Sequence, residues 1–209
     1  MRPKQQRGEA TVEQVLEAAL RIYASEGEAG LTVGAITKAS GVSSGSVYHH
    51  FGNLHGVVAT LALRSTGRLL EALAGALEQA TDARSGIRAV VRSYLDFART
   101  HPEAARLIHS VTADHELMTH PGQVRESQEA RLAPVARWIH AHTKSGELAD
   151  LPVPLIEALV LGPVVAVVRR WLTVGDLDLA EADRALPEQI WRSVSGAPGD
   201  GELATPGPS

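Results

Sequence analysis

The sequence has 209 residues, of which 44% are hydrophobic, and a formal net charge of -4. This composition suits a soluble protein of one or two domains with a hydrophobic core. Cysteine is absent, which excludes disulfides, thiolate zinc ligands and cysteine nucleophiles. No signal peptide or membrane-spanning segment is recognised, because the most apolar stretch, residues 155–168, is short and interrupted by glycine and proline. We therefore expect a cytoplasmic protein with no membrane partner.

The first helix is predicted from a capping box. Thr11 and Gln14 have the spacing of that motif, and apolar residues then recur at helical intervals up to about Gly27. Thr32 is expected to cap a short second helix that runs through Ala39.

A turn and a third short helix follow. Gly41 supplies the permissive backbone that a tight turn needs, and Ser43 is the expected N-cap. Within this helix the 100° spacing places Val47 and Phe51 on one side. The opposite side is predicted to face outward with Gly45, Ser46, Tyr48 and His49, while Ser44 and His50 lie toward the flanks.

The remainder of the chain also has helical periodicity. Helices are expected from Asn53 to about Leu77, from 85 to 99, in a short piece after Pro102, and over 123–143, 154–172 and 181–194. Residues 115–121 are expected to form a loop, and the glycine- and proline-rich residues 196–209 a disordered tail. No strand pattern occurs, so the predicted fold class is all-α.

A short helix, a glycine turn and a second short helix with a polar face predict a helix-turn-helix, whose second helix enters the major groove of DNA. Small residues at 44–46 allow the backbone to approach phosphates and base edges, and the helix N-terminus favours an anion. The net charge does not argue against this, because residues 1–56 carry equal numbers of bases and acids.

The residues of this motif carry a family resemblance. Gly30-Leu31-Thr32-Val33, Ile36, Ala39, Gly41-Val42-Ser43 and Gly45 to Phe51 resemble the N-terminal DNA-binding domain of TetR-type transcriptional regulators, over roughly residues 9–63. The resemblance implies a helix-turn-helix domain at 1–52, with a basic N-terminal arm, and a helical ligand-binding and dimerisation domain at 53–195. Residues 196–209 follow as the tail.

The resemblance also implies which residues contact DNA. These are Thr32 for phosphate, Ser43, Ser44, Gly45 and Ser46 for the backbone and bases, and Tyr48, His49 and His50 for phosphates and the groove wall. Leu54 and Gly34 depart from the family pattern, since many members carry basic residues at these places. Arg2, Lys4 and Arg7 either reach a minor groove or form a solubilising tail.

The histidines do not predict a metal or catalytic site. His115 and His120 are five residues apart, which places them on different faces of a helix and excludes the zinc-protease pattern. These two histidines could form a looser metal site together with His101 and His109. We favour the alternative that all four are ordinary solvated or hydrogen-bonded side chains. We therefore expect no enzyme, no metal and no cofactor.

A small-molecule pocket is expected in the C-terminal domain, although ordinary core packing explains the same residues. Its candidate lining is Tyr94, Phe97, Leu107, Ile108, His109, Val111 and Trp138.

The last two helices predict a homodimer. A helix that is apolar on nearly every face must be covered on all sides, so a partner copy is expected to pack on the two helices as a four-helix arrangement. The alternative is one buried central helix. The candidate interface residues are Leu155, Leu159, Val164, Val167, Trp171, Ile190 and Trp191.

These features predict a homodimeric repressor that binds a double-stranded palindromic operator and is released by an unknown small-molecule effector. Two alternatives remain open. One is a helical sensor or carrier without DNA binding, suggested by Leu54, Gly34 and the net charge of -4. The other is a DNA-binding protein that activates transcription or shapes DNA nonspecifically.

Overall fold

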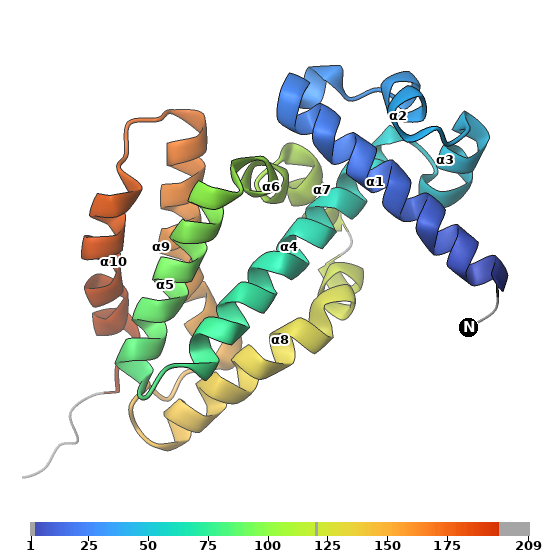
Figure 1. Cartoon of the computed structure of the whole chain (residues 1–209). Coiled ribbons are helices and arrows are strands. Elements are labelled where there is room, and N and C mark those ends of the chain that lie inside the picture. The colour runs from blue at the N-terminus through green and yellow to red at the C-terminus, as the bar shows by residue number, and fades with distance from the viewer. Residues whose placement is uncertain (1–2, 120, 197–209) are drawn as a thin grey trace, which may run out of the picture. The chain divides into compact units, whose positions relative to one another are not determined.

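The structure is a computed structural model that describes residues 3–119 and 121–196, apart from a few side chains within these ranges. The helices follow one another along the chain (Figure 1). They are α1 (Pro3–Gly30), α2 (Val33–Ser40), α3 (Ser44–Phe51), α4 (Leu54–Glu78), α5 (Ala83–Thr100), α6 (Pro102–Ile108), α7 (Val111–Thr119), α8 (Pro121–Lys144), α9 (Val153–Thr173) and α10 (Leu179–Val194). No strand occurs in the described ranges, which confirms the all-α prediction.

The chain divides into two compact units. The N-terminal unit comprises residues 1–68 and 101–128, and the C-terminal unit comprises residues 69–100 and 129–209. The long helices α4 and α8 each contribute one part to each unit. The contact-based division therefore differs from the predicted boundary at residue 52, because the start of α4 and the segment around α6 and α7 group with the first three helices.

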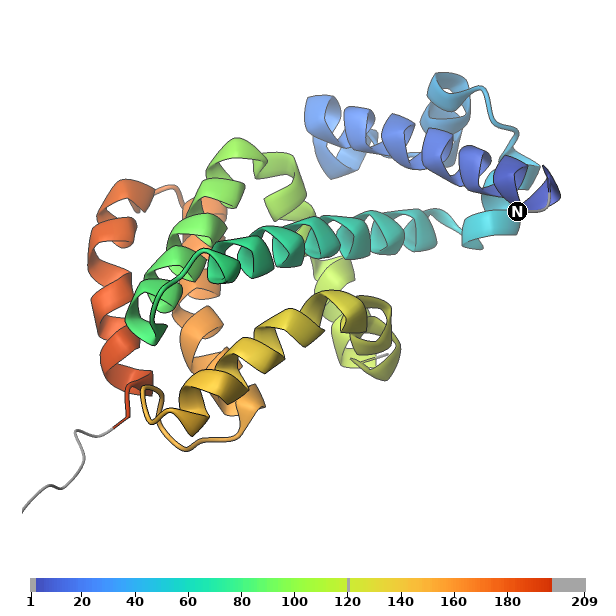
Figure 2. The same cartoon turned by 60° about the horizontal axis from the view of Figure 1, so that its bottom comes forward.

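The N-terminal unit is built around α1, which packs against α2 and α3 in both views (Figures 1 and 2). Its buried cluster gathers side chains from α1, α2, α3, α4 and α6. Val15, Ile36, Val47, Val57 and Leu107 are fully buried there. Burial of this apolar surface stabilises the short helices α2, α3 and α6, which would be marginal as isolated helices.

Helix α1 differs from the prediction at both ends. It begins at Pro3 and ends at Gly30, so Thr11 lies inside the helix and does not cap it. Proline suits the first turn of a helix, because its missing N–H would be unpaired there in any case. Gly27, the predicted end, has a φ of 68° and marks a kink within the helical span.

The expected loop at 115–121 is also wrong, because α7 reaches Thr119 and α8 begins at Pro121. The Ser110 Oγ accepts a 3.2 Å hydrogen bond from the Ala113 N–H, which caps the start of α7. Proline again occupies a first-turn position in α8. The sequence signal that was missed is the serine before Val111.

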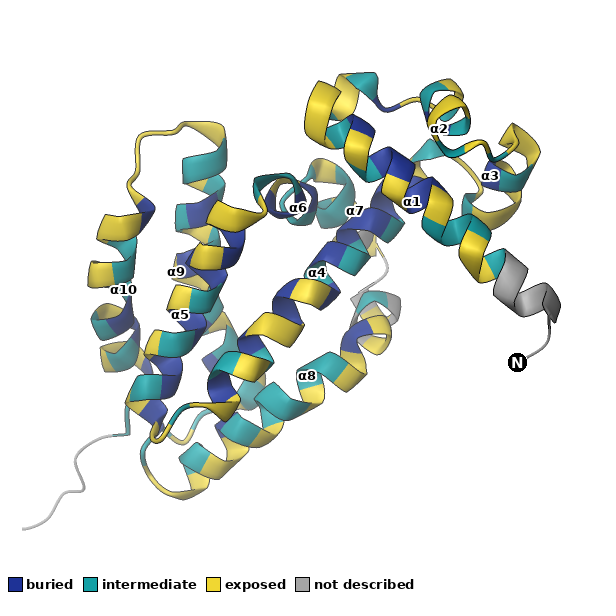
Figure 3. Cartoon of the chain, in the orientation of Figure 1, coloured by how far each residue is buried: buried dark blue, intermediate teal, exposed yellow. Residues whose placement is uncertain are grey.

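In the C-terminal unit, α5 packs against both α9 and α10, which also pack against each other. Helix α9 buries Ile156, Val160, Val164 and Val168, a row with four-residue spacing. Figure 3 shows buried positions along α5 and α9 and more exposed positions along α10. Surface ion pairs between α5 and α10, such as Arg84 with Glu188 at 2.6 Å, add little stability because they are exposed.

Candidate nucleic-acid interface

The turn between α2 and α3 is specified by local hydrogen bonds. The Thr32 Oγ1 accepts a 3.1 Å bond from the Ala35 N–H at the start of α2. Gly41 has a φ of 71°, a left-handed conformation that favours glycine, and its N–H donates to the Thr37 carbonyl. The Ser43 Oγ then accepts from the Ser46 N–H at 3.2 Å, which caps α3. The caps and the turn expected from the sequence are therefore confirmed.

Helix α3 has one buried side and one exposed side. Val47 is 0% exposed within the core cluster, and Phe51 packs against that cluster from a partly buried position. Tyr48 is 52% exposed, and His49 and His50 are exposed beside it. Thr32, Ser43, Ser44 and Gly45 are exposed as well, and Ser46 is half-buried. The predicted buried position of Val47 and the outward positions of Gly45, Tyr48 and His49 are therefore confirmed, whereas Ser46 is less exposed than predicted.

The exposed side of α3 presents groups suited to duplex DNA. Serine hydroxyls at its N-terminal end are exposed and can donate to phosphate oxygens or base edges. The first turn of a helix also leaves backbone N–H groups without an intrahelical partner, and here the Ser43 side chain accepts from the N–H of Ser46. The His49 and His50 rings contact each other edge to face with centroids 5.1 Å apart. The Ser43 hydroxyl also contacts the Ser46 hydroxyl at 3.1 Å, so Ser43 serves first as the helix cap.

The junction of α3 with α4 is close. The Asn53 Oδ1 accepts a 2.9 Å bond from the Gly56 N–H, which confirms Asn53 as the predicted cap of α4. Leu54, where the family pattern often has a basic residue, packs against the core cluster of the N-terminal unit. Arg64 on α4 pairs with Glu13 on α1 at 2.5 Å. The start of α4 is thus joined firmly to the helix-turn-helix.

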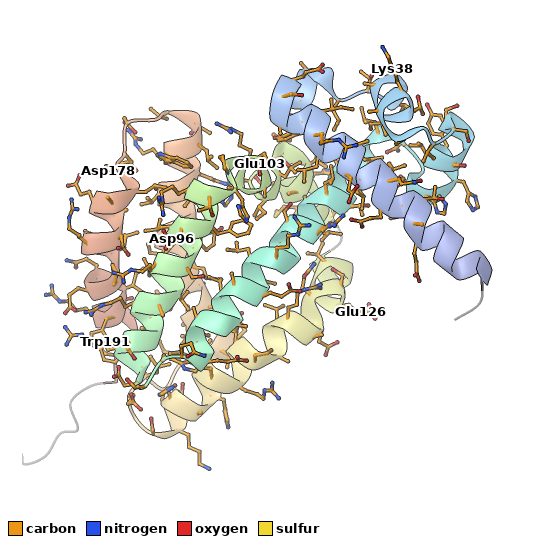
Figure 4. The ribbon with its side chains drawn as sticks, in the orientation of Figure 1. Lys38, Asp96, Glu103, Glu126, Asp178 and Trp191 are labelled. Atoms are coloured by element: carbon orange, nitrogen blue, oxygen red, sulfur yellow. The ribbon has the colours of Figure 1, made fainter. Side chains whose placement is uncertain are left out.

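Sequence reasoning did not single out Lys38 as an interface residue. It is exposed in the last turn of α2, and its side chain points away from the helices of the unit (Figure 4). The signal was present, because Lys38 is the basic residue nearest to the glycine turn. A cation at this place can contribute one phosphate contact.

The predicted N-terminal arm lies outside the side chains that the structure describes. Arg2 lies outside the described residues, as do the side chains of Lys4 and Arg7. Their assignment to DNA stays a prediction.

The predicted pocket residues are divided between the two compact units. Trp138 lines a cavity of about 80 Å³ in the C-terminal unit, together with apolar side chains of α4, α5, α8 and α9. Tyr94 and Phe97 are buried on α5 but do not line this cavity. Leu107, Ile108, His109 and Val111 belong to the N-terminal unit, where Leu107 is in the core cluster and Val111 is 84% exposed.

The predicted dimer residues divide by burial. Leu155 is 45% exposed, and Leu159, Val167, Trp171 and Trp191 are half-buried. Val164 and Ile190 are wrong as interface residues, because they are 0% and 2% exposed and pack within the chain. Helix α9 turns its row of buried residues toward α5 and α10, which the all-round apolar sequence did not distinguish from its outer face.

Within the part of the chain that the structure describes, no three histidine, aspartate or glutamate side chains gather as a metal would require. The centroids of the His55 and His115 rings lie 5.7 Å apart, in an edge-to-face contact. His120 lies outside the described residues.

Among the described helices, none has both the length and the hydropathy for a membrane span.

The capped helix, the glycine turn and the exposed second helix form a helix-turn-helix, an arrangement whose second helix enters the major groove in DNA-binding proteins. Residues 15–58 match the family described as bacterial regulatory proteins, tetR family. The transcriptional repressor AcnR of Corynebacterium efficiens is 31% identical over 84 residues, which cover 40% of each chain. The transcriptional regulator YobS of Bacillus subtilis is 30% identical over 100 residues, which cover 46% of this chain and 52% of that protein.

Solved structures extend the likeness of fold to most of the chain. A TetR family transcription regulator from Marinobacter aquaeolei has a TM-score of 0.71 at 22% identity, covering 92% of this chain and 100% of that one. The regulator FadR of Bacillus subtilis, solved in complex with stearoyl-CoA, has a TM-score of 0.62 at 18% identity, covering 85% and 96%. The likeness to the tetR family thus lies in the N-terminal residues, and the solved structures show that the fold of the chain is similar to that of such regulators. The matched regions cover 40% of the length of AcnR and 52% of the length of YobS, so the chain spans about half or less of each relative.

Proposed function

We propose that this protein is a homodimeric, cytoplasmic repressor that binds a palindromic operator and is released by a small-molecule ligand. The observation that carries the proposal is α3, whose buried Val47 fixes an outward side of hydroxyl, phenol and imidazole groups. In this proposal the recognition helices of two subunits enter successive major grooves about 34–36 Å apart.

The contacts divide by chemistry. Ser44, Gly45 and Ser46 approach base edges and the backbone, while Thr32, Tyr48 and the adjacent histidines contact phosphates and the groove wall. Phosphate contacts position the helix, and base contacts give sequence specificity. The matches to regulators, one of which is named a repressor, support this assignment.

The proposed dimer uses the outer face of α9. Leu155, Ala158, Gly162 and Ala166 are exposed along this helix, and Leu159 is half-buried. Small and apolar residues at helical spacing permit a close approach by the same face of a second copy, as a two-fold interface requires. The division of the chain into a DNA-binding domain at 1–52 and a ligand-binding and dimerisation domain at 53–195 remains part of the proposal.

Ligand release requires two states with different affinities for the operator. Helix α4 is suited to couple them, because it is one helix with Leu54 in the N-terminal core and Leu70 at the cavity. A ligand that changes the position of α4 would then change the spacing of the two recognition helices.

A gel shift of the purified protein on the DNA upstream of its own gene tests the proposal. We expect binding that depends on an intact palindrome and weakens as salt rises. Binding to the scrambled palindrome with the same affinity would contradict a specific repressor. If DNA affinity is absent at moderate salt, the carrier or sensor alternative applies, and a footprint placed upstream of the promoter would indicate an activator.

A further inference from the structure

The C-terminal unit contains a cavity with an almost wholly apolar wall. Side chains of α4, α5, α8 and α9 bound a space of about 80 Å³ that is open on part of its surface. The lining consists of aliphatic side chains together with Trp138 and Glu157. The Oε1 atom of Glu157 is buried, and the wall that a ligand meets exposes hardly any polar surface. A molecule that binds here gains apolar burial and dispersion contacts, and it meets no charged partner.

The volume of the cavity limits what it accepts. An engineered cavity of about 150 Å³ binds benzene. A space of about 80 Å³ therefore holds part of a single ring or a branched alkyl group, and the remainder of such a molecule lies toward the open side. A polypeptide helix is about 10–12 Å across and is too wide for this space. The cavity thus suits a small molecule and not a peptide segment.

Trp138 on α8 is held in the cavity wall by two neighbours. Its ring lies against α5 at Gly86, where an added Cβ would be 2.2 Å from the Cζ2 atom. The imidazole of His142, one turn later on α8, has its centroid 4.4 Å from that of the indole. The indole therefore cannot move toward α5 without meeting the backbone, and the imidazole packs against its ring.

His142 is itself held by contacts that reach the backbone. Its Nδ1 atom lies 3.0 Å from the Glu147 Oε1, and the Glu147 Oε2 accepts a 2.8 Å hydrogen bond from the Ala83 N–H. These contacts join the end of α8 to the start of α5. Trp138 is therefore a fixed part of the wall, because both of its neighbours are anchored.

We propose that the effector is a small uncharged hydrophobic molecule and that Trp138 sets the upper limit of its size. A charged group would lose its hydration in this cavity without gaining a partner. A larger ring system would have to displace the indole, which Gly86 and His142 hold in place. This inference rests on the proposed ligand response and names the chemical class of the effector.

Three probes with the same ring and different charges test the chemical class. In titration calorimetry on the full-length protein, we expect toluene to bind at least about tenfold more tightly than benzylamine or benzoate. Toluene should also shift the indole N–H NMR signal that is missing in Trp138→Phe. Binding of either ion as tightly as toluene would overturn the uncharged class. Absence of toluene binding, or binding that leaves this signal unchanged, would overturn the site.

Trp138→Phe tests the size limit, because it removes the part of the ring that lies at Gly86 and keeps an apolar wall. We expect naphthalene to bind the wild type more weakly than toluene does. In Trp138→Phe the ratio of naphthalene affinity to toluene affinity should rise about tenfold or more. Naphthalene binding to the wild type as tightly as toluene, or a ratio unchanged in the variant, would overturn the role of Trp138.

Val91→Ala is the matched control for this truncation. Val91 is buried on α5 but does not line the cavity, so the affinity ratio should stay at the wild-type value. Circular dichroism establishes that the variants are folded. Val160→Phe is an independent test, because the added ring occupies the cavity and should weaken toluene binding about tenfold or more. Unchanged toluene affinity in Val160→Phe would place the binding elsewhere and overturn the site.

The outcome is separable from that of the proposed function. If the operator gel shift succeeds but toluene does not bind, the effector class is wrong and DNA binding stands. If toluene binds at Trp138 but leaves the operator complex intact, the cavity is a binding site and its role as the effector site is wrong.

Discussion

A Cβ atom on Gly56 would lie 2.0 Å from the carbonyl oxygen of Phe51. The backbone at the junction of α3 and α4 therefore admits only glycine at this position, since neither the carbonyl nor the capped turn at Asn53 can move freely. Helix α3 is therefore positioned against α4 by this backbone approach as well as by its buried side chains.

Gly56→Ala should therefore destabilise the protein and weaken DNA binding. We expect a loss of about 1–3 kcal/mol or more, measured by urea denaturation, because the added methyl group overlaps the backbone. Gly75→Ala on the same helix is the control, because an added Cβ there meets nothing within 4 Å. Gly75→Ala should raise the free energy of unfolding by about 0.5–1 kcal/mol, because alanine has the higher helix propensity. A neutral Gly56→Ala would mean that the junction is not tight.

Tyr48 and Val47 are adjacent but face opposite ways, so their substitutions should separate binding from folding. Tyr48→Ala should abolish detectable operator binding with a melting temperature within a few degrees of the wild type, because the side chain is 52% exposed. Val47→Asp should unfold the N-terminal unit, because it buries an unpaired charge. Gel shift and circular dichroism measure the two effects. Wild-type DNA affinity in Tyr48→Ala would show that the exposed side of α3 is not the binding side.

Gly34 on α2 stands where many family members carry a basic residue, and the space around it admits such a side chain. An added Cβ there meets only the Thr32 Oγ1, at 4.0 Å, so a longer side chain fits without strain. Gly34→Lys should tighten DNA binding and steepen the slope of log affinity against log salt by about 0.9. Gly34→Ala is the matched control, since it changes helix propensity but adds no charge. The same salt slope in both variants would place Gly34 away from the phosphates.

Glu147 connects two segments of the C-terminal unit and should make stability depend on pH. Its Oε2 accepts a 2.8 Å bond from the Ala83 N–H, and its Oε1 lies 3.0 Å from the His142 Nδ1. The Ala83 hydrogen bond, with those of His142 and Ser145, lowers the pKa of Glu147. A lowered native pKa contributes stability that is present above the ordinary value and is lost as pH falls through the native one.

Urea denaturation between about pH 6 and about pH 3 tests this, because that range brackets the ordinary glutamate pKa of about 4.3. Glu147→Gln should be less stable than the wild type at the upper end, and the gap should narrow toward the lower end. Glu129→Gln should follow the wild-type curve. A gap that stays constant with pH would mean that the charge of Glu147 contributes nothing.

The outer face of α9 should control the oligomeric state. Ala166→Arg places a charge on this exposed face and should convert the proposed dimer to a monomer in sedimentation or light scattering, with weaker operator binding as a consequence. Ala72→Arg, at an exposed position of α4, should leave the assembly unchanged. A dimer that persists in Ala166→Arg would move the interface away from α9.

The sequence by itself determined the helix-turn-helix, because its signals are local. Thr32, Gly41 and Ser43 act on backbone groups within three or four residues, and Val47 and Phe51 share a side because of the helical repeat alone. The same reasoning failed at Thr11, since a capping pattern does not exclude a helix that began earlier. It also failed at 115–121, where Ser110 was not recognised as a cap.

Only the tertiary structure decided which faces of the later helices are covered. In α9 every turn is apolar, so the sequence could not separate Val164, which packs against the chain, from Leu155, which is exposed. Leu107 and Trp138 were both predicted to line a pocket. In the structure Leu107 belongs to the core of the N-terminal unit, and Trp138 lines the cavity of the C-terminal unit. The physical reason is that hydrophobic burial is not directional: it requires that an apolar face be covered but does not specify by what.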